Sequence, residues 1–372
     1  MDGLAAATVA GKSSISLARV LADSFRRHHP DIPFFVLLAD EADGYFEPDS
    51  EPFRLLRLAD LGIPNLPRFR FQYSQQELMY AVTPVLLRHL LDQGFPRVAF
   101  LKQESLVLRE LTPALELLRR RSIVLTPHLL NPLSGEAGAG RELNILQSGV
   151  YNVGFLGVAA TPTARAFLSW WEARLYEHCR HDVGHGMHFE QRWLDLVPAF
   201  FEDVEVVRDP GFNVAHWNLP ERAVAIDGER ITVDGSEGSF FRFSGFDPER
   251  ASDITRYSSR LTMSNVGAAA EIFRRYRMLL EAAGYHETKT WPYAYGYFAN
   301  GRPVAERARY LYRRLGDEAA RFGDPFDTAS SDSFFNWSRR QMRGLGRMKR
   351  YWWALHRVVR EIRRALASPP VS

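Results

Sequence analysis

The segment Lys102-Gln103-Glu104 has residue types and a spacing suited to chemistry on a phosphate. It directly follows the strand-like run 97–101, so its charged side chains stand at the end of a buried strand. Two carboxylates at this spacing would bind a divalent cation, but the ammonium of Lys102 repels a metal. A lysine can instead stabilise negative charge that develops on a phosphate oxygen. The segment therefore predicts electrostatic stabilisation of an anionic group by Lys102, beside the carboxylate of Glu104.

Strands and helices alternate through the first two thirds of the chain, which predicts an α/β sheet with helices on both faces. Apolar strand-like runs alternate with amphipathic stretches such as 13–30 and 160–179. In such sheets a ligand lies at the carboxyl ends of the strands, where Lys12, Asp40 and Lys102 would gather. We expect a mobile loop at 131–144, either a substrate lid or an ordinary surface loop, because this segment is rich in glycine. Helices and loops follow a domain boundary near residue 255.

Composition indicates a soluble, folded protein. Of 372 residues, 46% are hydrophobic, so the chain can form a large core. The net charge is +3, yet residues 339–364 carry ten Lys or Arg and one Glu, +9, which leaves −6 for the rest. The basic charge belongs to that segment, so we expect no nucleic-acid partner. A single cysteine, Cys179, favours a reducing compartment. We see neither a signal peptide nor a membrane span, and so expect a cytoplasmic protein.

Five segments occur in an order that resembles bacterial nucleotide-sugar glycosyltransferases of the GT-A fold, close to the family-8-like group. They are RVAFLKQESLVL (97–108), LNILQSGVYNVGFLGV (143–158), HFEQRWLDLVPAFF (188–201), GFNVAHWNLPER (211–222) and FFRFSGFDPE (240–249). The resemblance implies a Rossmann-like, mixed and mainly parallel sheet over residues 1–255, followed by a helical C-terminal region at 256–372. It also implies transfer of a sugar from a nucleotide-diphosphate donor to a glycan or lipid-linked acceptor.

The resemblance assigns roles to residues in each segment. Lys102, Glu104, Glu190 and Arg242 are expected at the reacting centre. The acceptor is expected at Asn213 and Trp217, which combine an amide with a flat aromatic face. The remaining candidates are expected to bind the donor, with the backbone at Ser244-Gly245 approaching its diphosphate; they are Thr8, Lys12, Gln147, Ser148, Asn152, Gln191, Ser244 and Gly245.

Two of the three metal ligands that the resemblance implies are cations here. In the family these ligands are the two carboxylates of a D-x-D motif and the histidine of H-F-S-G; this chain has Lys102, Glu104 and Arg242 in their places. We therefore expect no divalent metal cofactor, with Lys102 and Arg242 replacing the metal electrostatically. The alternative is a catalytically inactive module that binds a glycan or a protein partner. In that case Lys102 and Arg242 would pair with Glu104 and Glu190.

Two further segments allow more than one interpretation. Residues 338–367 predict a basic amphipathic helix, which packs on the protein or a second chain, or lies on an anionic membrane surface. The second interpretation would make the protein peripheral at the inner face of the membrane. Residues 178–190 contain several histidines, but their spacing fits no paired zinc-ligand pattern, so a solvated loop is favoured.

Overall fold

The computed structural model describes residues 3–342, which form two compact units. The first contains residues 3–66 and 73–294, and the second contains 67–72 and 295–342. The basic helix predicted at 338–367 lies almost entirely outside the described residues. Within 3–342, no helix combines the length and apolar character needed to span a membrane.

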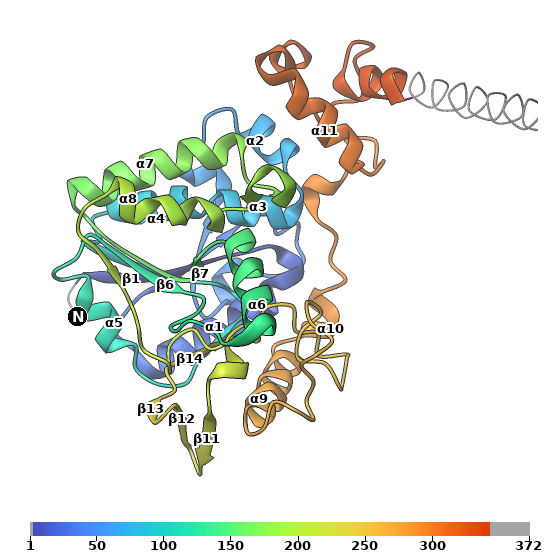
Figure 1. Cartoon of the computed structure of the whole chain (residues 1–372). Helices are drawn as coiled ribbons and strands as arrows, with labels where there is room; N and C mark the ends of the chain where they lie inside the picture. Colours follow the sequence, from blue (N-terminus) through green and yellow to red (C-terminus); the bar gives the residue numbers. More distant parts are fainter. Residues whose placement is uncertain (1–2, 343–372) are drawn as a thin grey trace, which may run out of the picture. The chain divides into compact units, whose positions relative to one another are not determined.

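A seven-stranded mixed sheet forms the centre of the first unit (Figure 1). Its strands run in the order β10 (Val204–Val206), β6 (Ile123–Pro127), β7 (Tyr151–Ala159), β4 (Arg97–Leu101), β1 (Leu4–Ala10), β2 (Phe34–Leu38) and β3 (Arg54–Arg57). Only β7 is antiparallel to its neighbours. Every residue of β1, β2, β4 and β6 is buried, as expected for strands covered on both faces.

Helices cover both faces of the sheet (Figure 1). One layer contains α1 (Ile15–His28) and α5 (Thr112–Leu117), and the other contains α4 (Thr83–Asp92), α7 (Pro162–Glu177) and the short α8 (Val197–Phe200). In α7 the buried residues recur with helical period and end in Leu168, Trp171 and Leu175. The predicted α/β class, with a mainly parallel sheet between helices, is confirmed.

The predicted loop at 131–144 is wrong for most of its length, because Gly135–Ser148 form the helix α6. This helix is rich in glycine, and Gly138 is its only buried residue. A prediction based on apolar periodicity therefore misses the helix. Gly138 is needed there since a Cβ would lie 2.8 Å from the Cβ of Leu133.

Two small strands connect the sheet to the later part of the chain. The strand β5 (Ser105–Val107) pairs antiparallel with β14 (Phe240–Arg242), and Arg242 lies opposite Ser105. A three-stranded sheet of β11 (Val224–Asp227), β12 (Arg230–Val233) and β13 (Ser236–Glu237) precedes β14. The β5–β14 pairing brings Glu104 and Arg242, which are 138 positions apart in sequence, to the same end of the central sheet.

The expected boundary near residue 255 falls inside the first unit. The helix α9 (Ala269–Ala282) shares a buried core with β5 and β14, in which Phe273 and Tyr276 surround the ring of Phe243. The Phe243 and Tyr276 rings are stacked with centroids 3.7 Å apart. The short helix α10 (Tyr285–Thr288) also belongs to this unit. Residues 256–294 are thus part of the first unit, because their apolar faces complete its core.

The second unit is helical and has a core of its own. It combines most of α2 (Leu66–Gln72) with α11 (Glu306–Leu315), and Phe71 is buried among Phe298, Tyr312 and Phe334. This unit supports the prediction of a helical C-terminal region, although it begins later in the chain than predicted.

Removing the Phe273 ring tests the role of α9 in the first unit. We expect Phe273→Ala to lower the free energy of unfolding by about 3–5 kcal/mol, since the residue is 1% exposed and its loss leaves a cavity. The control Met278→Ala, on the same helix but 59% exposed, should change stability by about 0.5 kcal/mol or less. Chemical denaturation followed by fluorescence measures both, and equal effects would contradict the assignment of α9 to the core.

Candidate active site

A cavity of about 1270 Å³ opens at the carboxyl end of the parallel strands. Lys102 enters it directly after β4, His128 directly after β6, and Asn152 from the start of β7, whose antiparallel direction brings that end to the same edge. Arg242 enters it from β14. This is the place in an open α/β sheet where ligands bind. The volume exceeds the roughly 300–1000 Å³ of an ordinary small-molecule site.

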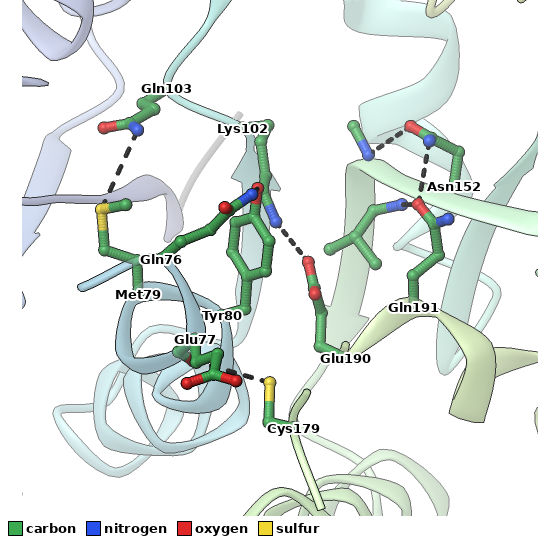
Figure 2. Close-up of polar contacts among 12 residues, drawn as sticks. Gln76, Glu77, Met79, Tyr80, Lys102, Gln103, Asn152, Cys179, Glu190 and Gln191 are labelled. Carbon is green, nitrogen blue, oxygen red and sulfur yellow. Dashed lines mark hydrogen bonds and ion pairs between the residues drawn. The ribbon is translucent and has the colours of Figure 1, made fainter. Parts of the chain in front are cut away.

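Lys102 lies in a nearly closed environment of one carboxylate and one aromatic ring (Figure 2). Its Nζ forms an ion pair with Glu190 and lies 3.4 Å from the ring centroid of Tyr80. The side chains of Lys102 and Glu190 are 6% and 3% exposed. Burial lowers the pKa of Lys102, and the Glu190 carboxylate opposes that effect. Glu190 and the ring face therefore favour the charged ammonium in this environment.

Arg242 forms a second buried ion pair. Its Nη2 and Nε donate to Oε1 of Glu104 at 2.9 and 3.2 Å. Its guanidinium also lies 5.3 Å from the ring centroid of Trp217. Burial alone would raise the pKa of Glu104, but Arg242 and Lys102 outweigh it and hold the pKa below its usual value. Glu104 is therefore ionised, and both expected metal-replacing cations already have a carboxylate partner within the protein.

Asn152 connects the Arg242–Glu104 pair to the surrounding backbone and side chains. Its Oδ1 accepts from Arg242 Nη1 at 2.7 Å, from the Gly154 amide at 2.7 Å and from Asn213 Nδ2 at 3.0 Å. Its Nδ2 donates to Oε1 of Gln191 at 2.9 Å. The Asn152–Gln191 contact is visible in Figure 2. The side-chain amide of Asn152 thus forms hydrogen bonds with other protein groups and holds residues of the site in place.

The other predicted donor residues divide into two groups. Gln147, Ser148, Gln191 and Ser244 line the cavity, and Gln191 Nε2 donates to the Ser148 carbonyl at 2.8 Å. Gly245 does not line it: the residue has φ 72°, and a Cβ would lie 2.6 Å from the ring of Tyr257. The close neighbour of Gly245 is therefore an aromatic side chain of this protein.

Thr8 and Lys12 are buried at the end of β1 and lie outside the cavity lining. Lys12 Nζ pairs with Asp43, is 3.9 Å from Asp40 Oδ1, and lies below the ring of Tyr45. Burial raises the pKa of Asp40 to about 6 against the opposing effects of the Ala294 amide and Lys12. These residues form a separate charged cluster.

The two predicted acceptor residues also differ. Trp217 lines the cavity, whereas Asn213 is buried and holds Asn152 from outside it. Glu104 likewise supports Arg242 from outside the cavity lining. The structure thus places Asn213 and Glu104 behind residues that line the cavity.

Several cavity residues were not predicted from sequence. Tyr80 and Gln76 come from α3 (Gln75–Ala81), Arg141 from α6, and Arg256 and Arg260 from the segment after β14. His128 had a usable signal, because it directly follows a buried strand as Lys102 does. The others come from helices and loops, and no periodicity in the sequence indicates which of their side chains face the sheet edge.

His128 is a neutral histidine with both ring nitrogens in use. Its Nδ1 lies 3.3 Å from the Val150 carbonyl and its Nε2 lies 2.9 Å from Asn152 Nδ2, an arrangement that fits a proton on Nδ1. Burial, with the nearby charge of Arg242, lowers its pKa to about 3. Within residues 3–342, no three His, Cys, Asp or Glu side chains come together as a metal-binding group.

Comparison with known proteins identifies distant relatives. No family model matches the chain. Two Bacillus subtilis proteins, both uncharacterized, are similar: YfnF is 26% identical over 246 residues (64% of this chain, 80% of YfnF), and YfnD is 23% identical over 247 residues (64% and 76%).

Solved glycosyltransferase structures are also similar to this chain. The galactosyltransferase LgtC with donor and acceptor sugar analogs has a TM-score of 0.41 and 14% identity, covering 74% of this chain and 95% of LgtC. GlyE of Streptococcus pneumoniae TIGR4 has a TM-score of 0.42 and 14% identity, covering 79% and 66%. Because these similarities are remote, a function for this protein has to be argued from the residues that line the cavity.

The neutral His128 predicts a pH dependence of stability. Its folded pKa is depressed, so the unfolded chain binds the proton more tightly, and stability falls as pH drops below the unfolded value of about 6.5. Between pH 6 and pH 4, His128 should contribute a slope of up to about 1.4 kcal/mol per pH unit. Denaturant titrations should show a shallower pH dependence for His128→Gln than for wild type; parallel curves would contradict the assignment.

Proposed function

We propose that this protein transfers a sugar from a nucleotide-diphosphate donor to a glycan or lipid-linked acceptor without a metal ion. The observation that carries this proposal is the charge of the cavity. Five of its lining residues are Lys or Arg and one, Glu190, is acidic; Glu104 and Glu221 pair with Arg242 and Arg141 from outside the lining, which leaves a formal balance of +2 without the histidines. A cavity of that charge at the carboxyl edge of an α/β sheet suits a diphosphate. The order of the five sequence segments supplies the reaction class.

Lys102 and Arg242 would stabilise the leaving group. In glycosyl transfer the oxygen of an acceptor hydroxyl bonds to the anomeric carbon and its proton is released, while the bond from that carbon to the diphosphate oxygen breaks and its electron pair stays on that oxygen. Fixed cations close to this oxygen lower the barrier, and the low dielectric of a buried site strengthens their effect. Lys102 and Arg242 are nearly buried and fixed by Glu190, Glu104 and Asn152, so little reorganisation would be needed.

The remaining roles follow from position. Gln147, Ser148 and Ser244 line the cavity and are proposed to contact the donor, and Trp217 is proposed to contact the acceptor. Glu190 is the only carboxylate of the described cavity lining. We propose that Glu190 acts at the reacting centre after a bound diphosphate has competed with it for Lys102.

A second candidate function is that of a non-catalytic glycan- or partner-binding module. It is favoured by one observation, the pairing of both cations with Glu190 and Glu104, as a site that no longer performs chemistry would have. The two functions differ in donor hydrolysis, since an active transferase slowly releases free nucleotide from its donor without an acceptor.

Metal independence is tested with that hydrolysis. We expect one nucleotide sugar among a panel to be hydrolysed to free nucleoside diphosphate at the same rate with EDTA and with manganese, because cations of the protein replace the metal. Inhibition by EDTA that manganese reverses would contradict metal independence. Absence of hydrolysis with every donor would favour the binding module.

Paired neutralisation tests Arg242 without leaving a buried charge unpaired. We expect Arg242→Gln with Glu104→Gln to reduce donor hydrolysis by roughly 100-fold or more, the size of effect seen when one stabilising donor is removed from a charged transition state. Thermal melting controls for folding. The control pair Arg121→Gln with Glu205→Gln removes an exposed ion pair outside the cavity and should retain full activity. Unchanged hydrolysis in the Arg242 variant would exclude this role.

A further inference from the structure

We propose that the acceptor carries an anionic group, a phosphate or a carboxylate, which Arg256 and Arg260 bind at the mouth of the cavity. This inference rests on the proposed function, which uses the inner cations Lys102 and Arg242 for the donor. It assigns a second anion site and a substrate class, an anionic sugar, to residues that the donor site leaves unused.

The two arginines lie on a short turn that lines the cavity. Asp253 and Thr262 form an antiparallel bridge, and the Met263 amide donates to the Ser252 carbonyl at 2.8 Å. The residues between the bridged positions, 254–261, are called the flap here. The Arg256 amide donates to the Gly245 carbonyl at 2.8 Å, so the flap is attached to the segment that follows β14. All flap residues from 256 to 261 line the cavity.

The flap carries the unpaired positive charge of the site. Of the five basic lining residues, Lys102 pairs with Glu190, Arg242 with Glu104, and Arg141 with Glu221. Among residues 3–342, no ion pair joins Arg256 or Arg260 to a carboxylate, and the Arg256 guanidinium contacts the Tyr257 side chain, donating to its hydroxyl at 3.0 Å. The other three cations each have a carboxylate partner in the protein, so the basic lining residues without one lie on the flap.

Aromatic rings beside the flap provide a surface for a sugar. The Tyr257 ring lies 5.9 Å from His216, and His216 lies 5.1 Å from Trp217. Burial, with the charge of Arg242, lowers the pKa of His216 to about 4, so this ring is neutral at pH 7 and does not add to the positive charge. Flat rings bind the apolar face of a pyranose while the arginines bind its anionic substituent.

The dimensions of the cavity agree with two ligands. Its volume of about 1270 Å³ exceeds what one nucleotide-sized ligand fills. The nearly buried Lys102 and Arg242 mark its interior, whereas Arg256, Arg260 and the 55% exposed Tyr257 mark its opening. A donor bound first to the inner cations would leave the opening to the acceptor, with its anion at the flap.

Binding of glucose 1-phosphate, glucuronate and glucose tests the flap site directly. Each sugar is titrated into the protein by calorimetry, with and without saturating nucleoside diphosphate. We expect the two anionic sugars to bind at least about tenfold more tightly than glucose, and to bind in the presence of the nucleotide, because two charged hydrogen bonds are gained. Comparison of the phosphate and carboxylate arms identifies the preferred anion. Equal affinities for anionic and neutral sugars would overturn the proposal.

The double variant Arg256→Gln with Arg260→Gln locates the interaction. It should remove the preference for anionic sugars and leave nucleotide affinity unchanged. The control Arg27→Gln with Arg120→Gln removes two exposed arginines outside the cavity and should keep the preference. Loss of nucleotide affinity in the flap variant, or displacement of the anionic sugar by nucleotide, would assign the arginines to the donor and overturn the proposal.

The same experiments separate this inference from the proposed function. If no nucleotide sugar is hydrolysed but anionic sugars bind in a flap-dependent manner, transfer activity is wrong and the anion site stands. If hydrolysis occurs and the flap variant changes neither sugar binding nor its anion preference, the anion site is wrong and the transferase stands.

Discussion

The candidate site depends on two buried ion pairs, one of which is hydrogen-bonded to Asn152. Burying a charge is costly unless a partner and further hydrogen bonds compensate for it. Lys102 is compensated by Glu190 and the face of Tyr80, and Arg242 by Glu104 and Asn152. Because Asn152 also binds Asn213, Gln191 and His128, a shift of one member would disturb hydrogen bonds on several elements. Hydrogen bonds and ion pairs within the protein therefore fix the positions of these side chains before any ligand binds.

This arrangement separates two kinds of positive charge. The inner cations are rigid and paired, so they would serve chemistry that needs fixed positive groups at low reorganisation cost. The flap arginines are exposed and free of carboxylates among the described residues, so they suit capture of an anion from solvent. With fixed charges in its interior and exposed charges at its opening, the cavity can bind two anionic ligands at different depths.

The fold itself holds Lys102 and Arg242 in place. A metal centre would organise its ligands on binding, whereas here the β5–β14 pairing and the strand ends organise the cations beforehand. The closed network around Asn152 also explains why its amide, a reasonable contact for sugar hydroxyls on sequence grounds, faces protein groups. The same residue types can support a ligand site directly or hold its members in place.

The amino-acid sequence by itself determined the α/β class and the strand-end position of Lys102, because fully apolar runs between amphipathic stretches have few structural alternatives. The ordered segments also pointed to Glu190, Gln191 and Arg242. Only the tertiary structure decided which carboxylate pairs with which cation, since Lys102–Glu190 and Glu104–Arg242 contacts span 88 and 138 residues. It also decided that α9 completes the first unit, that Thr8 and Lys12 lie outside the cavity, and that Arg256 and Arg260 line it. Each of these results depends on long-range packing, which no local periodicity or propensity encodes.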